Sequence, residues 1–163
     1  MKIGFIGLGN LGRAICSRLS SLGDELIVYN RNKDKIKDLP YKIVNTPKDI
    51  LKECDVIFLC LFDSPAVENI LSGENGILCD ELKGKTIIDL TTNHYEDVLE
   101  FHKLVNDFGG NYLENPVFGS VAPALKGELT VVSSGKTEVF EAMRPILEKI
   151  AKDTKYTIIM PDY

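Results

Sequence analysis

The chain has 163 residues, enough to bury one hydrophobic core but too few for two ordinary domains. Its 44% hydrophobic and 26% charged residues are typical of a soluble globular protein, and a net charge of −5 with scattered basic residues argues against nucleic-acid binding. No apolar run approaches the roughly 20 residues that a membrane helix needs, so we expect no membrane partner.

Apolar residues alternate between the spacing of strands and that of helices along the chain. Short apolar runs predict strands at residues 2–6, 26–29, 42–44, 56–61, 86–89, 111–115 and 129–134, and an edge strand at 156–160. Helical spacing or helix-start residues predict helices at 10–22, at 32–39, after Thr46, from Ser64 to Gly73, from Asn93 to Phe108, between the strands 111–115 and 129–134, and from about Thr137. This alternation predicts the α/β class, with a doubly wound, mostly parallel Rossmann-type sheet as a single domain over residues 1–163.

Three local patterns predict where helices start or stop. Thr46 is expected to cap a helix with its hydroxyl, followed by Pro47 and an early acid. Asn93 and Glu96 have the spacing of a capping box. Pro145 is expected to break the last helix in two, because proline removes a helical N–H.

A glycine pattern, G-x-G-x-x-G, lies between the first strand and the first helix. In this context one glycine allows the tight turn, one lets the backbone approach a pyrophosphate, and one lets helix and strand pack closely. The helix start also directs free N–H groups and partial positive charge at the phosphates. We therefore expect a dinucleotide to bind along Gly7, Leu8, Gly9, Asn10, Leu11 and Gly12, the alternative being a glycine-rich turn without a ligand.

The second strand ends at Asn30 and Arg31, where an NAD-binding chain carries an acid that holds the adenosine ribose. Asn30 removes the charge that would repel a 2′-phosphate, and the Arg31 guanidinium suits phosphate oxygens. Lys35, one turn into the next helix, adds attraction, with Lys33 a second candidate. This pattern predicts NADP(H) as the cofactor and makes NAD a weaker alternative. Arg31 as an ordinary solvated side chain is the competing interpretation.

Four cysteines and the N-terminal segment bear on the compartment. No two cysteines form a C-x-x-C pair and neither histidine shares a helical face with one, so we expect buried thiols in a reducing compartment and no metal site. The segment MKIGFIGLG lacks the apolar region and cleavage site of a signal peptide, and we interpret it as the first strand of a cytoplasmic protein.

Over nearly its whole length the chain resembles the cofactor domain of the β-hydroxyacid dehydrogenases, a family that includes 3-hydroxyisobutyrate dehydrogenase, glyoxylate/succinic semialdehyde reductase and 6-phosphogluconate dehydrogenase. Three motifs in order carry the resemblance: GFIGLGNLG at 4–12, DLTT at 89–92, and ENPVFGSVAPALKGELTVVSSG at 114–135. The pair Asn30-Arg31 resembles the NADP-preferring, glyoxylate reductase-like members.

The resemblance implies roles for residues beyond the glycine segment. Leu61 and Phe62 are expected to line the cofactor, and Thr92 to lie beside it. Thr91 matches the serine whose hydroxyl and backbone hold the substrate carboxylate. Two further residues, Gly119 and Ser120, match a second substrate loop. Two aromatic residues, Phe62 and Phe118, depart from the family pattern, and the second bears on which substrate fits.

The implied activity is hydride transfer between the nicotinamide and a small hydroxyacid or its semialdehyde or keto acid. The family's general acid–base lysine lies on a later helix, and Lys126, Lys136 and Lys149 do not match it. We therefore assign no catalytic residue here and expect this chain alone to bind cofactor but turn over poorly. The full-length protein is expected to be a homo-oligomer. An imine reductase-like enzyme and a non-catalytic NADP-binding module are the alternatives.

Overall fold

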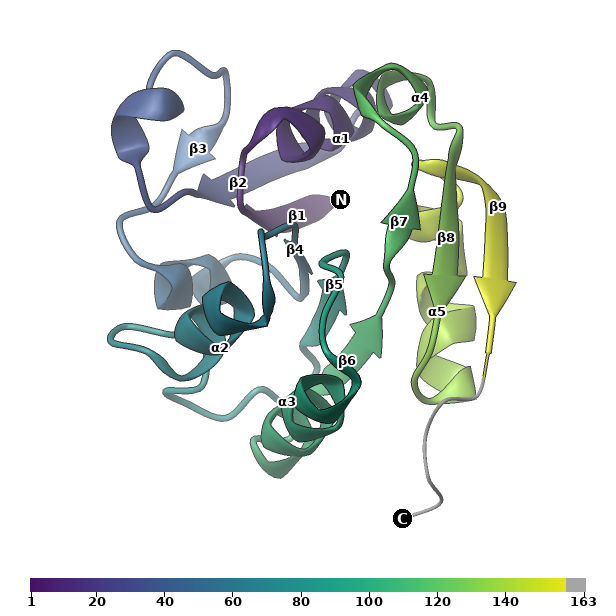
Figure 1. Ribbon diagram of the computed structural model, residues 1–163. Coiled ribbons are helices and arrows are strands. Elements are labelled where there is room, and N and C mark those ends of the chain that lie inside the picture. Colours follow the sequence, from purple (N-terminus) through teal and green to yellow (C-terminus); the bar gives the residue numbers. More distant parts are fainter. Residues whose placement is uncertain (158–163) are drawn as a thin grey trace.

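The computed structural model describes residues 1–157 and shows strands and helices alternating along the chain (Figure 1). The strands are β1 Lys2–Ile6, β2 Glu25–Tyr29, β3 Lys42–Ile43, β4 Val56–Leu59, β5 Thr86–Asp89, β6 Asn111–Glu114, β7 Val117–Phe118, β8 Leu129–Ser133 and β9 Ala151–Tyr156. The helices are α1 Asn10–Ser21, α2 Ser64–Ser72, α3 Tyr95–Asp107, α4 Val121–Lys126 and α5 Thr137–Leu147, with 3₁₀ turns η1 Lys33–Lys35 and η2 Pro47–Lys52.

Six strands form one parallel sheet in the order β3-β2-β1-β4-β5-β6. The chain runs outward from β1 to β3, crosses back, and continues from β4 to β6 on the other side. The order therefore reverses between β1 and β4, which is the point where open α/β sheets bind ligands beyond their carboxyl ends. The predicted doubly wound Rossmann-type fold is confirmed.

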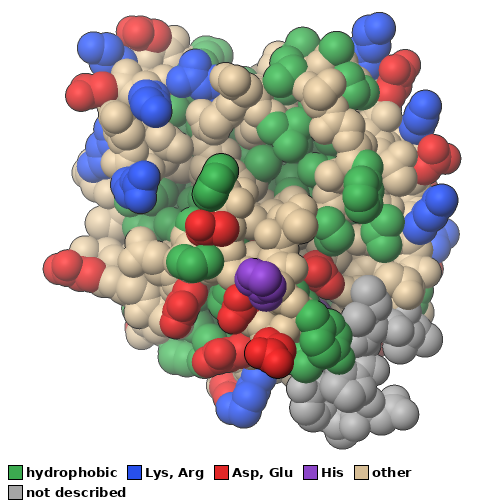
Figure 2. All heavy atoms as spheres, in the orientation of Figure 1, with side chains coloured by type: hydrophobic (Ala, Val, Ile, Leu, Met, Phe, Trp, Pro, Cys, Tyr) green, Lys and Arg blue, Asp and Glu red, His purple; other side chains and the backbone are tan. Residues whose placement is uncertain are grey.

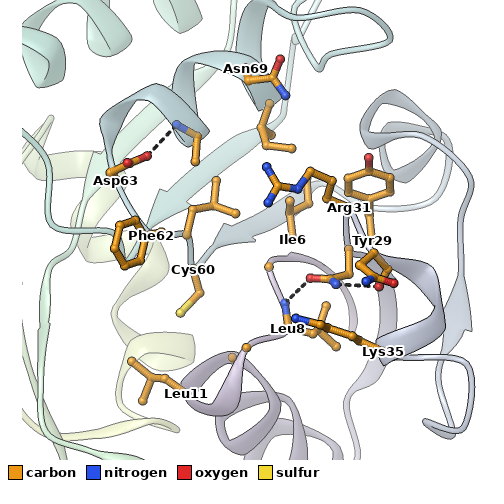
Figure 3. Close-up of a pocket in the computed structure, with 18 of the residues that line it drawn as sticks. Ile6, Leu8, Leu11, Tyr29, Arg31, Lys35, Cys60, Phe62, Asp63 and Asn69 are labelled. Atoms are coloured by element: carbon orange, nitrogen blue, oxygen red, sulfur yellow. Dashed lines mark hydrogen bonds between the residues drawn. The ribbon is translucent and has the colours of Figure 1, made fainter.

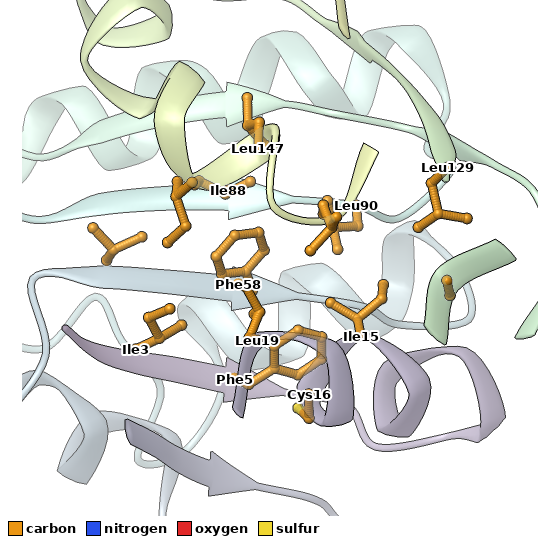
Figure 4. Close-up of a cluster of buried hydrophobic side chains, with 14 of the residues drawn as sticks. Ile3, Phe5, Ile15, Cys16, Leu19, Phe58, Ile88, Leu90, Leu129 and Leu147 are labelled. Carbon is orange, nitrogen blue, oxygen red and sulfur yellow. The ribbon is translucent and has the colours of Figure 1, made fainter. Parts of the chain in front are cut away.

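Both faces of this sheet are covered, which explains why its central strands are apolar on both sides. On one face, α1, α4 and α5 pack against a cluster that includes Phe5, Ile15 and Phe58 (Figure 4). The rings of Phe5 and Phe58, on neighbouring strands, stack with centroids 5.8 Å apart. On the other face, α2 and α3 cover a second cluster that includes Ile57 and Val67.

A second, three-stranded sheet has the order β7-β8-β9, with β7 antiparallel and β9 parallel to β8. It shares the core of the first sheet, because Leu129 and Val131 of β8 belong to the same buried cluster as Phe58. Polar contacts also join the two parts. Lys149 donates to the buried Asp24 carboxylate at 2.7 Å, and its carbonyl accepts from Arg18 Nε at 3.0 Å.

Several predicted helix boundaries differ from the structure. The helix predicted at 32–39 is only the 3₁₀ turn η1, and the segment after Thr46 is the 3₁₀ helix η2. The Thr46 N–H and hydroxyl both donate to Asp49 Oδ2, at 3.1 and 2.6 Å. Pro145 lies inside α5 without breaking it. Proline removes one helical bond there, and burial of the next two residues, Ile146 and Leu147, in the core offsets that loss.

The end of the chain and the cysteines also differ from expectation. Strand β9 starts at Ala151, five residues before the predicted strand 156–160, of which residues 158–160 lie outside the described range. The short strand β7 was not predicted. Cys79 is exposed, so the expectation of buried thiols is wrong for that residue, whereas Cys16 and Cys54 are buried.

Within residues 1–157, none of the helices has both the length and the apolar character needed to cross a membrane. The same part of the chain holds no group of three or more His, Cys, Asp or Glu side chains placed to bind a metal ion.

Substitution of Phe58 tests the contribution of the core that holds the central strands in place. Its ring is fully buried, so Phe58→Ala should lower the free energy of unfolding by about 3–5 kcal/mol through lost contacts and the cavity left behind. Urea unfolding followed by circular dichroism measures this change. Phe118→Ala, which removes a ring that is 60% exposed, should change stability by less than about 0.5 kcal/mol. Equal losses in the two variants would contradict the assignment of the core.

Candidate functional site

A cavity of about 810 Å³ opens at the carboxyl ends of β1, β2 and β4, at the position where the strand order reverses (Figure 3). Ten predicted cofactor residues line it, namely Gly7, Leu8, Gly9, Leu11, Gly12, Asn30, Arg31, Lys35, Leu61 and Phe62. The cavity is also lined by Pro65, Ala66, Asn69 and Ile70 of α2, which no motif singled out. Two predicted residues, Asn10 and Thr92, are exposed and do not line it.

The three glycines of the first turn differ in what a side chain would meet. Gly7 has φ +97°, and a Cβ there would lie 2.2 Å from the Cys60 carbonyl oxygen. A Cβ on Gly12 would lie 2.1 Å from the Gly7 carbonyl oxygen. Around Gly9 there is open space, with no atom within 4 Å of an added Cβ. Gly7 and Gly12 are therefore required for packing, whereas Gly9 leaves room beside the cavity.

The start of α1 is free to receive an anion. The helix begins at Asn10 with Gly9 as its N-cap, and no side chain caps it. The first N–H groups of an α-helix have no partner within the helix, and the macrodipole adds partial positive charge. The residues present therefore fit a pyrophosphate, which needs several converging N–H donors and close backbone approach.

Asn30 joins the glycine turn to the end of β2. Its Oδ1 accepts the Leu8 N–H at 3.0 Å and its Nδ2 donates to the Asn32 carbonyl at 2.8 Å (Figure 3). From the sequence, Asn30 was expected at the cofactor as an uncharged residue that does not repel a 2′-phosphate. In the structure both ends of its carboxamide bind the protein, so Asn30 holds the two loops of the cavity in register.

Arg13 is a second link between these loops and was missed in the sequence. Its Nε donates to the Leu8 carbonyl at 3.1 Å, and its terminal nitrogen donates to the Lys35 carbonyl. No motif assigns this position, because Arg13 follows the last glycine on a helix that was interpreted only by its apolar face. The two contacts position the segment that carries Arg31 and Lys35.

Positive charge gathers at this end of the cavity. Arg31, Lys33, Lys35, Lys37 and Lys42 are exposed, and Figure 2 shows Lys and Arg side chains over the region of η1 and β3. Lys33 and Lys42 have partners in Asn45 and Glu53. None of the ion pairs in the described part of the chain includes Arg31 or Lys35, the two that line the cavity. Both are thus available to an anionic ligand.

The predicted substrate residues lie outside this cavity. Thr91, after β5, is only 2% exposed, and its Oγ1 accepts the Leu61 N–H at 3.0 Å. Gly119, with φ +134°, and the exposed Ser120 precede α4. Phe62 and Phe118 are 94% and 60% exposed. Both aromatic residues that depart from the family pattern are therefore exposed and can contact a ligand.

The capping box predicted at Asn93 is wrong, because this side chain is used elsewhere. Helix α3 starts at Tyr95 with His94 as an N-cap that makes no side-chain bond. Asn93 Nδ2 instead donates to Asp89 at 2.9 Å, and Asn93 Oδ1 accepts from Ser64 at 3.1 Å. Tertiary partners have taken both ends of the carboxamide.

A buried polar cluster lies below this loop. Asp89 is fully buried and accepts hydrogen bonds from Thr91 N at 2.9 Å and Tyr112 Oη at 2.6 Å. The His102 and Tyr112 rings pack edge to face, with their centroids 4.7 Å apart. Burial, with a smaller effect of Lys136, lowers the pKa of His102 to about 4, so the ring is neutral near pH 7.

Taken together, the reversal of strand order, the uncapped helix start and the cationic end of the cavity define a dinucleotide-binding α/β domain. Residues 2–160 match the family model described as the NAD binding domain of 6-phosphogluconate dehydrogenase. The chain therefore belongs to this family, as the resemblance to β-hydroxyacid dehydrogenases indicated.

Known proteins share this domain at moderate identity. The chain is 36% identical over 155 residues to 2-hydroxy-3-oxopropionate reductase of Escherichia coli (strain K12), covering 94% of this chain and 53% of the reductase. It is 30% identical over 155 residues to the cytokine-like nuclear factor N-PAC of Homo sapiens, covering 93% of this chain and 28% of that protein. The structure of Psf3 in complex with NADP+ and 2-OPP superposes with a TM-score of 0.90 at 32% identity, covering 96% of this chain and 57% of Psf3. The chain thus spans about half the length of the reductase and of Psf3.

The glycine turn gives a pair of contrasting substitutions. Gly9→Ala adds a methyl group where the fold has open space, so the melting temperature should stay within about 2 °C while NADPH binding weakens at least tenfold. Gly12→Ala forces helix and strand apart and should lower stability by more than about 1 kcal/mol. Thermal unfolding and calorimetric titration measure both. Retention of full NADPH affinity in the Gly9 variant would show that the phosphates bind elsewhere.

The neutral His102 makes stability depend on pH. An unfolded histidine takes up a proton below about pH 6.5, whereas the folded ring does so only near 4, so stability is lost as the pH falls through this window. The loss amounts to up to about 3 kcal/mol, from roughly 1.4 kcal/mol per unit of pKa difference. His102→Phe keeps a ring beside Tyr112 and removes the titration. Urea unfolding at pH 7 and 4.5 should show a smaller loss of unfolding free energy in the variant than in the unaltered protein. An equal loss in the two proteins would contradict this account.

Proposed function

We propose that this chain is the NADP(H)-binding domain of an oxidoreductase that transfers hydride to or from a small hydroxyacid or its semialdehyde or keto acid. The observation that carries the cofactor choice is Arg31, an exposed guanidinium without an ion-pair partner among the described residues, at the end of a dinucleotide cavity. The uncharged Asn30 precedes it where an acid would repel a 2′-phosphate. The presence of NADP+ in the Psf3 structure supports the same cofactor.

The bound cofactor would supply or accept the hydride, and the chain's residues would position the cofactor. The N–H groups at the start of α1 would hold the pyrophosphate, with Gly9 leaving room for its approach. Arg31 and Lys35 would hold the phosphate on the adenosine ribose. Leu61 and Phe62 would form the wall at the far end of the cavity.

For the substrate, we propose a small carboxylate bound at the loops after β5 and β7. The name of the Escherichia coli relative, a reductase of 2-hydroxy-3-oxopropionate, supports a hydroxyacid semialdehyde. Gly119 and Ser120 are exposed on the loop after β7 and offer N–H and hydroxyl donors, and Thr92, expected beside the cofactor, is exposed on the loop after β5. The exposed Phe118 ring would favour a substrate with an apolar part beside its carboxylate. We further propose a cytoplasmic location and assembly into a homo-oligomer.

A second candidate is a non-catalytic NADP-binding module that acts through partner contacts. The similarity to N-PAC, whose name states no enzymatic activity, supports this second candidate. NADPH oxidation by the full-length protein with 2-hydroxy-3-oxopropionate, glyoxylate or succinic semialdehyde separates the two candidates. Turnover of one of these compounds supports the reductase, and tight NADPH binding without any turnover supports the module.

Arg31→Ala tests the cofactor choice directly. Loss of a charge-assisted hydrogen bond worth roughly 1.5–3 kcal/mol should weaken NADPH binding about tenfold to a hundredfold while NADH binding changes less than about twofold. Nicotinamide fluorescence during titration measures both affinities. Lys37→Ala removes an exposed cation that does not line the cavity and should leave the ratio of the two affinities unchanged. Equal affinity of the unaltered protein for NADH and NADPH would refute the proposed preference.

A further inference from the structure

The loops that follow β4 and β5 are linked by hydrogen bonds between neighbouring strands. The Leu61 N–H donates to Thr91 Oγ1 at 3.0 Å. Ser64 Oγ accepts the His94 N–H at 3.0 Å and donates to Asn93 Oδ1 at 3.1 Å. The wall of the cofactor cavity and the loop of the DLTT motif therefore form one hydrogen-bonded unit.

The Thr91 hydroxyl is enclosed within this unit. Its Oγ1 accepts the Leu61 N–H at 3.0 Å, and the Thr91 N–H donates to the buried Asp89 carboxylate at 2.9 Å. Thr91 is only 2% exposed, so its hydroxyl is not accessible to a substrate carboxylate, which is the role that the family resemblance implied for Thr91.

Asp89 is the fixed end of the unit. It is fully buried, and its carboxylate accepts from Thr91 N, Asn93 Nδ2 and Tyr112 Oη at 2.9, 2.9 and 2.6 Å. None of the ion pairs within residues 1–157 includes Asp89. Burial raises the pKa of Asp89, and the hydrogen bonds from Tyr112, Thr91 and Asn93 oppose that rise. A buried carboxylate with this many donors holds them rigidly, because leaving any of them unpaired is costly.

Leu61 connects this unit to the cavity. The side chain lines the cavity together with Phe62, which follows it, and Thr91 holds its backbone N–H. A Cβ on Gly7 would approach Leu61 Cδ2 to 2.8 Å, so the leucine side chain also packs on the glycine turn. A shift of the Leu61 backbone would therefore move a wall of the dinucleotide cavity.

We propose that Asp89 and Thr91 are positioning residues that fix Leu61 at the wall of the cofactor cavity, and that Thr91 does not bind the substrate through its hydroxyl. This inference rests on the proposed binding of NADP(H). Asp89 and Thr91 would affect the end of the cavity remote from Arg31, because β2 and β5 lie on opposite sides of β1 in the sheet.

Calorimetric titrations with NADPH and with 2′,5′-ADP, which has the adenosine and 2′-phosphate but no nicotinamide half, test the proposal. Thr91→Val removes the hydroxyl at nearly constant shape and should weaken NADPH binding about tenfold while 2′,5′-ADP binding changes less than twofold. Thr91→Ser keeps the hydroxyl and should bind NADPH within twofold of the unaltered protein. Thr86→Val, a buried threonine at the opposite end of β5, is the matched control and should leave both affinities unchanged.

Two results would overturn the proposal. They are unchanged NADPH binding in Thr91→Val, as expected if Thr91 served only the substrate, and an equal loss of NADPH and 2′,5′-ADP, as expected from general destabilisation. Failure of the unaltered protein to bind either ligand would instead refute the proposed cofactor. If Thr91→Val does not fold, hydrogen exchange of the Leu61 amide in the unaltered protein decides. Slow exchange supports the bond to Thr91, and exchange at the rate of an exposed amide overturns it.

Discussion

The close approach of α1 to β1 at the glycine turn is the constraint on which the site depends. Only a residue without a Cβ fits at Gly12, whose added methyl would lie 2.1 Å from the Gly7 carbonyl oxygen. This contact brings the uncapped start of the helix to the carboxyl end of the central strand, where the strand order reverses. Without it, the free N–H groups would point away from the cavity, and neither the cationic end nor the wall at Leu61 would face a common ligand.

Around this turn, side chains bind backbone groups and so fix the loops before a ligand arrives. Asn30 holds the Leu8 N–H, Arg13 holds the Leu8 and Lys35 carbonyls, and Thr91 holds the Leu61 N–H. Each bond removes freedom that a ligand would otherwise have to restrict on binding. The loops around the cavity therefore form a preorganised frame, and Asn30, Arg13 and Thr91 act by holding that frame.

The sequence predicted the parts that depend on local or periodic properties. The parallel sheet followed from apolar runs, and the cavity followed from the glycine spacing together with the Asn30-Arg31 pair. It failed where tertiary packing overrode a local pattern. Asn93 has the pattern of a helix cap, but Asp89 and Ser64 occupy its carboxamide. Pro145 has the pattern of a helix breaker, but core burial of the following residues keeps the last turn helical. Neither outcome is visible in a local window, because both depend on tertiary packing.

The residue at position 30 links the choice of cofactor to the shape of the loop. A carboxylate there would accept the Leu8 N–H, as Asn30 does, but it has no hydrogen for the Asn32 carbonyl and would repel it. The loop carrying Arg31 would then lose a bond that orients it, in addition to meeting a negative charge beside the phosphate site. Preference for the 2′-phosphate is therefore a property of the folded loop as much as of the guanidinium. Exchange of Asn30 for aspartate alone would therefore remove the bond to the Asn32 carbonyl and leave Arg31 and Lys35 in place, so it changes the loop as well as its charge.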